Sequence, residues 1–308
     1  MDFFCCEVGH AAPKGGWPKH PIYIYKLADA LERPVAAMAS GQDHAFVAAH
    51  KTSELLRTWI VTAYTHGQAF TAPTNLWCYT EEKGTHWYKG VPEDYAWLFR
   101  FVRANARFFD GYDAVAPVAV VYDNAARRAG KGAIEPICAA LDTANIPFAL
   151  AVAGDDWLDY RLTPEKLAPF KVLIVAEQPE YMDAAQRSLL EGSGRMAVFS
   201  DAVLDELPRI VVENNLDISA VLRIKPGDLS APVVCHVHSR RYDSQDDRVI
   251  PQKNVVLHIP RTLLPDRSYG DAAIYTPGGK EQNVRIETHD NEIRLRLSRV
   301  ALWHVVTL

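Results

Sequence analysis

The sequence has few of the features that would tie it to a membrane or to a nucleic acid. No apolar run approaches the roughly 20 residues that a helix needs to span a bilayer, and no segment resembles a signal peptide. Acidic residues outnumber basic ones, 38 against 33, so no excess of positive charge is present to neutralise phosphates. These absences predict no membrane partner and no nucleic-acid partner. They also favour a cytoplasmic location, if the natural protein begins at Met1.

Cysteine is scarce as well. The five cysteines are scattered along the chain, at Cys5, Cys6, Cys78, Cys138 and Cys235. Adjacent residues of a strand point to opposite faces, so Cys5 and Cys6 are poor partners in a disulfide or a zinc site. His236 and His238 would share one face of a strand, but no third ligand accompanies them in the sequence. We therefore expect reduced structural thiols, no metal and no cofactor.

What the sequence does contain is three segments of different periodicity. Residues 1–112 alternate strand-like and helix-like stretches in the rhythm of a β/α barrel, with about three strands, far fewer than a closed barrel needs. Residues 113–227 carry near-continuous apolar runs, typical of parallel strands that are buried on both faces. Residues 228–308 carry short alternating runs separated by turn formers, typical of an antiparallel sandwich.

The predicted fold class is therefore α/β plus all-β. We expect the last part of a β/α (TIM-type) barrel, then a small parallel sheet of flavodoxin-like or amidotransferase-like type, then a C-terminal antiparallel β-sandwich. The middle segment lacks a phosphate-binding loop, because AARRAGKG follows the strand-like VVYDN and matches neither G-x-G-x-x-G nor the P-loop. Asp155 and Asp156 follow another strand without a nucleophile elbow beside them. We expect neither nucleotide binding nor amidotransferase-like activity there.

The order of the three segments resembles the family 42 β-galactosidases, which are glycoside hydrolases. RPVAAMASGQDHAF resembles their seventh barrel strand, LLRTWIVTAYTHGQAFTAPTNLWCY the next helix and strand, and VVCHVHSRRYD with PQKNVVLHIP a part of their terminal sandwich. The resemblance implies a trimerisation-type domain at 113–227, hence a homo-oligomer, either a trimer or a dimer. It also implies an oligo- or polysaccharide substrate and hydrolysis of β-linked sugars through a pair of carboxylates.

The matched residues do not supply that pair. The family's nucleophile is a glutamate that ends the seventh strand, whereas the matching stretch from Ala36 to Gly41 has no carboxylate. The acid/base glutamate belongs to a fourth strand, which these residues do not match. The resemblance therefore implies that this chain holds only part of such an enzyme. A non-catalytic module for oligomerisation or carbohydrate binding is the alternative.

Glu7 is the candidate catalytic residue. It follows the strand-like FFCC, and in β/α barrels the carboxyl ends of the strands carry the active site. A sugar contact without catalysis and a purely structural hydrogen bond are the alternatives for this side chain.

Five residues of the neighbouring loops are candidates for substrate binding: His10, Asp43, His44, Trp77 and Tyr79. His10 lies in the loop after the first strand, and Asp43 and His44 follow the second strand. Aromatic rings such as those of Trp77 and Tyr79 stack on the apolar faces of sugars. Asp43 could instead cap the helix that follows it, and the aromatic residues could instead belong to a core or to an oligomer contact.

Overall fold

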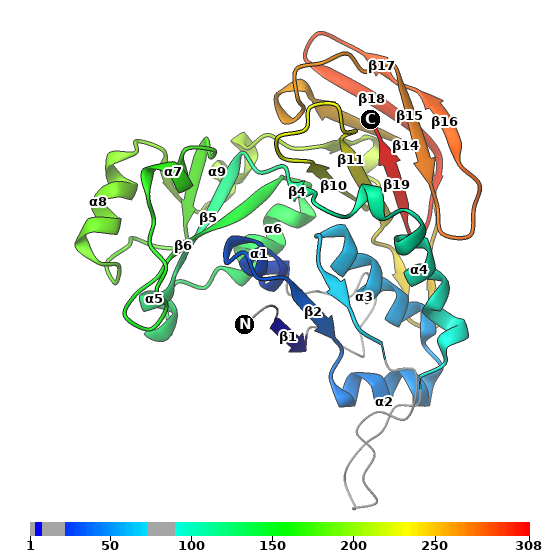
Figure 1. Ribbon diagram of the computed structural model, residues 1–308, viewed down its shortest axis with the longest axis horizontal. Coiled ribbons are helices and arrows are strands. Elements are labelled where there is room, and N and C mark those ends of the chain that lie inside the picture. Colours follow the sequence, from blue (N-terminus) through cyan, green and yellow to red (C-terminus); the bar gives the residue numbers. More distant parts are fainter. Residues whose placement is uncertain (1–3, 8–21, 73–89) are drawn as a thin grey trace, which may run out of the picture. The chain divides into compact units, whose positions relative to one another are not determined.

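The computed structural model describes residues 4–7, 22–72 and 90–308 (Figure 1). These residues form two compact units. Unit 1 contains the described residues of 1–20, 34–113 and 211–308, and unit 2 contains those of 21–33 and 114–210. No helix in the described ranges is both long and apolar enough to cross a membrane.

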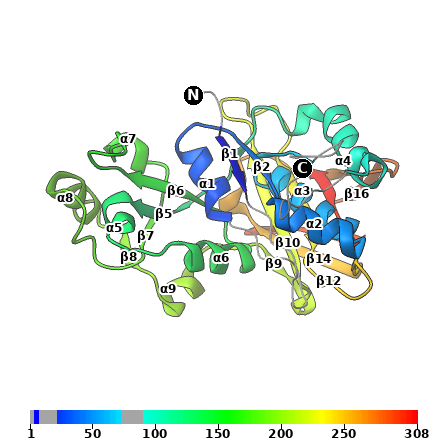
Figure 2. The same cartoon turned by 90° about the horizontal axis from the view of Figure 1, so that it is seen from below.

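Unit 1 contains the three-stranded parallel sheet that the sequence predicts as the end of a β/α barrel. Its order is β1 (Phe4–Glu7), β2 (Val35–Met38) and β3 (Ala69–Phe70). Figure 2 shows β1 beside β2, and residue pairs such as Glu7 with Met38 set the register. Within the described ranges these strands do not close into a barrel.

The two faces of this sheet differ in burial. Directly paired residues of parallel strands point to the same face, so the buried Val35, Ala37 and Phe70 share one covered face. Glu7 pairs with Met38 on the other face, and its side chain is exposed. The sheet therefore has one covered face and one more open face that carries Glu7.

Helix α3 (Ser53–Thr65) forms the centre of unit 1. Leu55, Leu56, Trp59 and Ile60 are completely buried, and a helix that is buried on nearly all sides needs apolar residues around its whole circumference. Its neighbours in sequence are α2 (Gly41–His50) and α4 (Pro92–Ala104), followed by a 3-10 turn, η1 (Ala106–Phe108).

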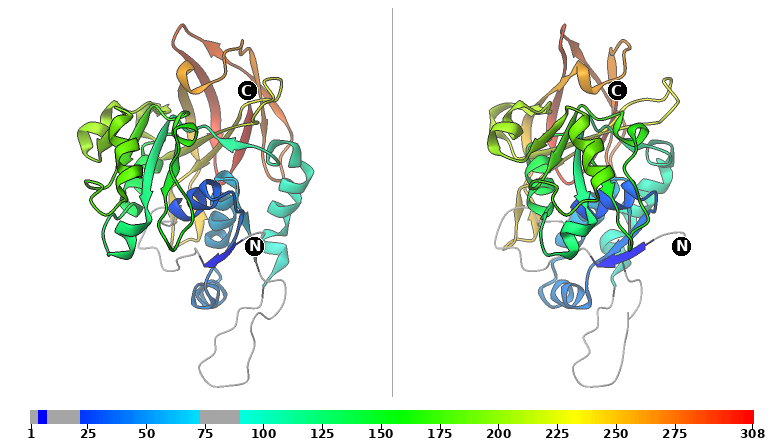
Figure 3. Two further views of the ribbon diagram at one scale, coloured as in Figure 1. Left: turned by 60° about the vertical axis from the view of Figure 1, so that its left-hand side comes forward. Right: turned by 90° about the vertical axis from the view of Figure 1, so that its left-hand side faces the viewer.

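The C-terminal part of unit 1 is the predicted antiparallel sandwich. One sheet has the order β16-β15-β19-β11-β10-β4 and the other the order β17-β18-β14-β9. All of these strands except β4 come from residues 211–308, which run from yellow-green to red in Figure 3. In β18, Ile293, Leu295 and Leu297 are buried at every second position, as a sheet with one covered face requires.

The bounds of the strands in the first sheet are β4 (Asp113–Ala114), β10 (Ile218–Ile224), β11 (Val234–Ser239), β15 (Asp271–Tyr275), β16 (Gln282–Arg285) and β19 (His304–Thr307). Those of the second sheet are β9 (Val211–Val212), β14 (Gln252–Pro260), β17 (Glu287–Thr288) and β18 (Glu292–Val300). Shorter elements are η2 (Glu213–Asn215), η3 (Arg261–Leu263) and a hairpin of β12 (Tyr242–Asp243) with β13 (Arg248–Val249).

Unit 2 is built on the predicted parallel sheet. Its strands have the order β6-β5-β7-β8 and all described pairs are parallel. The strands are β5 (Val118–Asp123), β6 (Phe148–Ala153), β7 (Val172–Val175) and β8 (Met196–Val198). The helices are α1 (Ile22–Ala30), α5 (Asn124–Arg128), α6 (Glu135–Thr143), α7 (Pro164–Leu167), α8 (Ala184–Gly192) and α9 (Asp201–Glu206).

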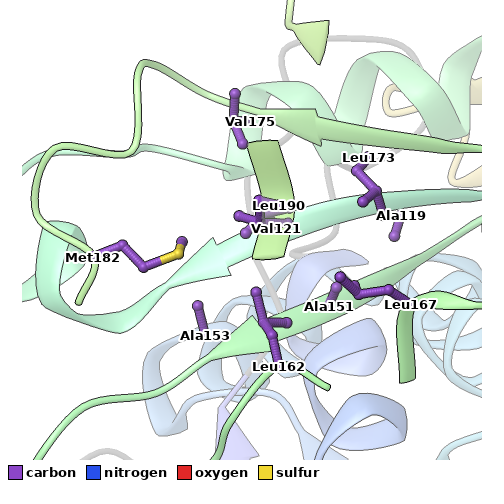
Figure 4. Packing of buried hydrophobic residues seen from close by; sticks show 10 residues of the cluster. All are labelled: Ala119, Val121, Ala151, Ala153, Leu162, Leu167, Leu173, Val175, Met182 and Leu190. Atoms are coloured by element: carbon purple, nitrogen blue, oxygen red, sulfur yellow. The ribbon is translucent and has the colours of Figure 1, made fainter. Parts of the chain in front are cut away.

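One face of this sheet forms the hydrophobic cluster shown in Figure 4. Alternate strand residues such as Ala119 and Val121 pack there with Leu167 of α7 and Leu190 of α8. On the opposite face, α1 packs against β6 and α6, and the Lys26 amine lies 5.0 Å from the centre of the Phe148 ring.

The contacts of α1 depart from the expectation for residues 1–112. By sequence α1 lies in the barrel-like segment, yet it packs with the sheet of unit 2. Strand β10 also precedes the expected boundary near residue 228 and pairs with β11 of the sandwich. The division into domains at 1–112, 113–227 and 228–308 stays a prediction, beside the two units that contacts define.

Two long-range contacts connect the helical and β parts of unit 1. The carboxylate of Asp247 accepts hydrogen bonds from the backbone N–H groups of Glu54 and Leu55, at 2.9 and 3.1 Å. It therefore caps the first turn of α3 from a loop of the β-rich part. The buried Arg223 of β10 lies against Gly67, where φ is +79° and a Cβ would collide with the guanidinium group.

Replacing the capping carboxylate should destabilise unit 1. In Asp247→Asn, one oxygen becomes an amide donor that faces backbone N–H groups, and the acceptor for the Tyr242 hydroxyl at 2.7 Å is weakened. We expect a loss of about 1–2 kcal/mol in the free energy of unfolding in urea. Asp246→Asn is the matched control, because that exposed carboxylate makes only a surface ion pair with Arg248. Equal effects of both substitutions would contradict the capping role.

The sandwich contains an ionisable bridge at His258. Its Nδ1 lies 2.9 Å from Glu292 Oε1 and its Nε2 lies 2.8 Å from Glu213 Oε1. Partial burial alone would lower the pKa of this imidazole, but the hydrogen bonds with Glu292 and Glu213 outweigh burial and raise the pKa above 6.5. Both ring nitrogens then donate to carboxylates, so the bridge needs the charged form.

This bridge predicts a pH-dependent stability. A raised pKa in the folded state contributes stability that is complete below about pH 6.5 and disappears as the pH rises through the raised value. His258→Gln should therefore cost more stability at pH 6 than at pH 8.5, as measured by urea unfolding at both values. Gln282→Ala, at an exposed position without a titratable group in the same part of the chain, should cost the same at each pH. A cost of His258→Gln that does not change with pH would rule out the charged bridge.

Candidate functional site

The candidate site is the carboxyl edge of the three-stranded sheet of unit 1. Glu7 is the last residue of β1, and β2 ends beside it at Met38. Because β1, β2 and β3 are parallel, their carboxyl ends lie at the same edge. The structure therefore places Glu7 at a strand end, exposed, and on the more open face of the sheet. The carboxyl ends of the strands are where β/α barrels carry their active sites.

The Cys5 side chain shares this face with Glu7. Its Sγ lies 3.5 Å from the Met38 sulfur on the neighbouring strand. The covered face holds the alternate residues of the same strands, such as the buried Ala37. The open face thus presents one carboxylate, one free thiol and one thioether. The carboxylate is the group that glycoside hydrolases use for proton transfer to a glycosidic oxygen.

Asp43 has a structural role at the start of α2. Ser40 Oγ accepts a hydrogen bond from the Asp43 N–H at 3.1 Å, and the Asp43 carboxylate accepts from the Ser40 N–H at 3.3 Å. This reciprocal pair is a capping box, which stabilises the first turn of a helix. The capping alternative for Asp43 is confirmed, and a contact with substrate stays a prediction.

His44 is buried rather than presented to solvent. None of its surface is exposed, and burial lowers the pKa of its imidazole to about 4, against a smaller raising effect of Asp43. The side chain is therefore neutral at physiological pH. The geometry does not support the predicted contact of His44 with a substrate.

The remaining candidates, His10, Trp77 and Tyr79, lie outside the described residues. Their roles stay predictions. Within the described ranges, no group of three or more side chains of the His, Cys, Asp and Glu types is placed to hold a metal ion. His236 and His238 of β11 are both buried, and the His236 ring stacks on Trp303 with 5.9 Å between ring centres.

A second edge with carboxylates lies at the carboxyl ends of the strands in unit 2. Asp123 ends β5 and caps α5, with the Ala126 N–H at 3.0 Å. Burial raises the pKa of the Asp123 carboxyl, against a smaller lowering effect of the backbone N–H groups that it accepts. Glu177 follows β7 and accepts the N–H of Gly132 at 2.6 Å.

Asp155, after β6, has the most hydrogen bonds of this group. Its Oδ1 accepts from Asn124 at 2.8 Å and from the N–H of Trp157 at 2.9 Å, while its Oδ2 accepts from Arg128 at 2.8 Å. Desolvation acts to raise the pKa of this carboxyl, but the hydrogen bonds together hold the pKa well below its usual range. Asp155 is therefore a fixed anion that organises its loop.

No nucleophile motif accompanies this edge in the sequence, so no amidotransferase-like activity is expected there. The signal that could have drawn attention to it is the run GDDW, in which a glycine, two carboxylates and a tryptophan follow a buried strand directly. Such a run joins a tight turn to an aromatic side chain at the strand end where parallel sheets place their ligands.

No family model matches the sequence. The chain is 26% identical over 264 residues to an alpha-agarase of Thalassotalea agarivorans and 26% identical over 266 residues to an alpha-agarase of Alteromonas agarilytica. Each match covers 82% of this chain and 18% of the relative. The chain thus spans less than one fifth of the length of these curated relatives.

Among solved structures, the fold is similar to that of alpha-L-fucosidase isoenzyme 2 from Paenibacillus thiaminolyticus. The TM-score is 0.58 at 11% sequence identity, and the match covers 99% of this chain and 64% of that chain. At this identity the likeness concerns the fold. The two curated relatives carry the name of a glycoside hydrolase, and the comparisons do not single out the family 42 β-galactosidases.

The burial of His44 predicts a loss of stability in acid. Its pKa in the folded state is about 4, so stability present above about pH 6.5 is lost as the pH falls toward 4, by up to about 1.4 kcal/mol per pH unit. His44→Leu removes this titration and should flatten the stability profile over that range, as measured by urea unfolding at several pH values. Ala49→Leu, at an exposed position without a titratable group in the same helix, should leave the slope unchanged. An unchanged slope in His44→Leu would refute the assignment.

Proposed function

We propose that this chain serves in the hydrolysis of a polysaccharide, with Glu7 as a residue that touches the scissile sugar. The observation that carries the proposal is the similarity to two alpha-agarases, which extends over 82% of the chain. The exposed carboxylate of Glu7 at the end of a parallel strand supplies a chemical group that fits this reaction. The substrate class is a neutral galactan of the agar type, as the names of the relatives suggest.

The anomeric form of the cleaved bond is part of the proposal. The family 42 resemblance implied β-linked sugars, whereas both curated relatives and the solved structure carry names with the prefix alpha. We infer an α-linked substrate on that ground. Agarose offers a direct comparison, because its chain alternates α and β linkages and the two cleavages leave different sugars at the new reducing end.

Hydrolysis of a glycoside requires two carboxyl groups, about 5 Å apart in retaining enzymes and about 6.5–9.5 Å apart in inverting ones. Glu7 is one candidate. Asp43, which follows β2 toward the same edge, is already engaged in the capping box with Ser40. This engagement is the observation that favours the second candidate function, a carbohydrate-binding module without turnover. Self-association through residues 113–227 is compatible with both candidate functions, the hydrolase and the carbohydrate-binding module, and stays a prediction.

Glu7→Gln tests the first function. The amide keeps the size and the hydrogen-bonding reach of the side chain but cannot transfer the proton or act as a nucleophile. Turnover of agarose oligosaccharides should fall at least about a hundredfold, while the dissociation constant for the same oligosaccharides stays within a factor of three or so, as expected for a group that acts mainly in the transition state. Released products are identified by their reducing-end sugar.

Glu93→Gln is the matched control, because Glu93 is an exposed glutamate in the first turn of α4. It should retain full turnover. A change of affinity alone in Glu7→Gln would make Glu7 a binding residue. Binding without turnover in the unsubstituted chain would support the carbohydrate-binding module, and equal turnover in both variants would remove Glu7 from the site.

A further inference from the structure

Unit 2 contains a cavity of about 620 Å³ beside the carboxyl end of β6. The loop at 154–161 forms one wall, and the segment that leads into α8 forms the other, through side chains that include Tyr181 and Gln186. Ligands of open parallel sheets bind outside the carboxyl ends of the strands. The cavity is therefore at the edge of the sheet where a ligand is expected.

The loop that forms the first wall is held in one shape by the protein itself. A Cβ at Gly154 would collide with the carbonyl oxygens of Leu158 and Tyr160, so the chain folds closely back on this glycine. Arg161 donates to the carbonyl oxygen of Tyr160 at 2.8 Å. The buried Gln186 of α8 donates to the Gly154 carbonyl at 3.0 Å and accepts the Leu162 N–H at 2.9 Å. The two walls are thus joined by hydrogen bonds, and the cavity is preformed.

Trp157, at the tip of this loop, is 79% exposed. Its backbone N–H is bound by Asp155, and the Arg128 guanidinium lies 4.8 Å from the centre of one ring of its indole. Asp155 in turn fixes Arg128 through an ion pair of 2.8 Å. One face of the indole therefore lies against the Arg128 cation, and most of the remaining ring surface is open to solvent.

Tyr181 provides a second exposed aromatic ring, 46% exposed, in the lining of the cavity itself. Tyr and Trp side chains are enriched at binding surfaces, because one part of each side chain is apolar and another part is polar. Rings that are held rigidly lose little conformational entropy when a ligand stacks on them. The loop and Tyr181 thus present aromatic faces next to polar groups.

The charges around these rings select among possible ligands. Two guanidinium groups, of Arg128 beside Trp157 and of Arg161 in the lining, face four carboxylates. The carboxylates are those of Asp155, Asp156, Asp159 and Asp183. Because negative charge is in excess here, the rim disfavours an anion such as a phosphate or a sulfated sugar. The polar residues beside Trp157 also differ from the apolar centre of a subunit interface. A neutral sugar meets both requirements, because its C–H face stacks on aromatic rings and its hydroxyls donate to carboxylates.

We propose that the loop 154–161 and Tyr181 form a binding site for a neutral oligosaccharide in unit 2, independent of Glu7. The site would hold a polysaccharide chain without reacting with it. The choice of a sugar as the ligand rests on the proposed function, whereas the cavity and the exposed rings do not.

The test measures binding of an agarose hexasaccharide to the full chain by titration calorimetry. Trp157→Ala and Tyr181→Ala should each weaken binding by about tenfold, as expected for the loss of one stacking ring, and Trp157→Phe should restore part of the affinity. The control is Leu229→Ala in unit 1, because Leu229 is also 79% exposed and should leave the affinity unchanged. Circular dichroism spectra confirm that each variant is folded.

A second probe, a sulfated galactan oligosaccharide of the same length, should bind more weakly than the neutral one. Equal affinity of Trp157→Ala and the unsubstituted chain for the neutral probe would overturn the proposal, as would tighter binding of the sulfated probe. Sedimentation velocity gives a further outcome: if Trp157→Ala dissociates an oligomer without weakening sugar binding, the exposed rings form a subunit contact and the proposal is wrong.

Failure of this site and failure of the proposed function have different signatures. Loss of turnover in Glu7→Gln with normal sugar binding in Trp157→Ala would leave the hydrolase proposal standing and remove the site in unit 2. Weakened sugar binding in Trp157→Ala, in a chain that hydrolyses nothing, would establish the site and remove the hydrolase proposal.

Discussion

The burial of α3 is the constraint on which unit 1 depends. A helix with Leu55, Trp59 and Ile60 fully enclosed has no stable place in water, and its surroundings come from parts of the chain far away in sequence. Asp247, 192 residues after Leu55, supplies the acceptor for its first turn. Tyr64, near its last turn, stacks on Trp303 with 6.4 Å between ring centres. The short parallel sheet and the sandwich consequently share one core, and the strand that carries Glu7 is held by a structure that the C-terminal residues complete.

The two carboxyl edges of the protein differ in what their carboxylates do. At the edge in unit 2, Asp155 accepts four hydrogen bonds, from Asn124, Arg128 and the N–H groups of Trp157 and Leu158. These hydrogen bonds keep the Asp155 carboxylate ionised, so it cannot donate a proton near neutral pH. Its role is to hold the loop in place. At the edge in unit 1, Glu7 is exposed at the strand end. A carboxylate therefore organises a loop in unit 2, whereas the carboxylate of Glu7 in unit 1 is accessible to solvent.

Patterns that repeat along the chain predicted the parts of the fold that depend on local burial. The apolar runs of β5 to β7 gave the parallel sheet, and the alternation in β18 gave the sandwich. A local pattern does not identify the element that an amphipathic helix packs against. The periodicity of α1 shows which side is buried but not which sheet it covers. In the structure, α1 contacts β6 and α6. The sequence also could not predict that Asp247 caps α3. No local pattern around either segment indicates a contact between residues so far apart in the chain.

The same distinction explains the candidate site. The position of Glu7 at a strand end follows from a local pattern of apolar residues that stops at a carboxylate, and the structure has that arrangement. The burial of His44 depends on how α2 packs. In the sequence, Asp43 and His44 are adjacent polar residues after a strand, so both are predicted to lie in an exposed loop. In the helix, residues one position apart lie about 100° apart around the axis, so Asp43 remains at the partly exposed capping position while His44 points inward and is completely buried. Adjacent polar residues after a strand therefore predict the edge of the sheet at which they lie. Whether each side chain can reach a ligand depends on which side of the following helix it occupies.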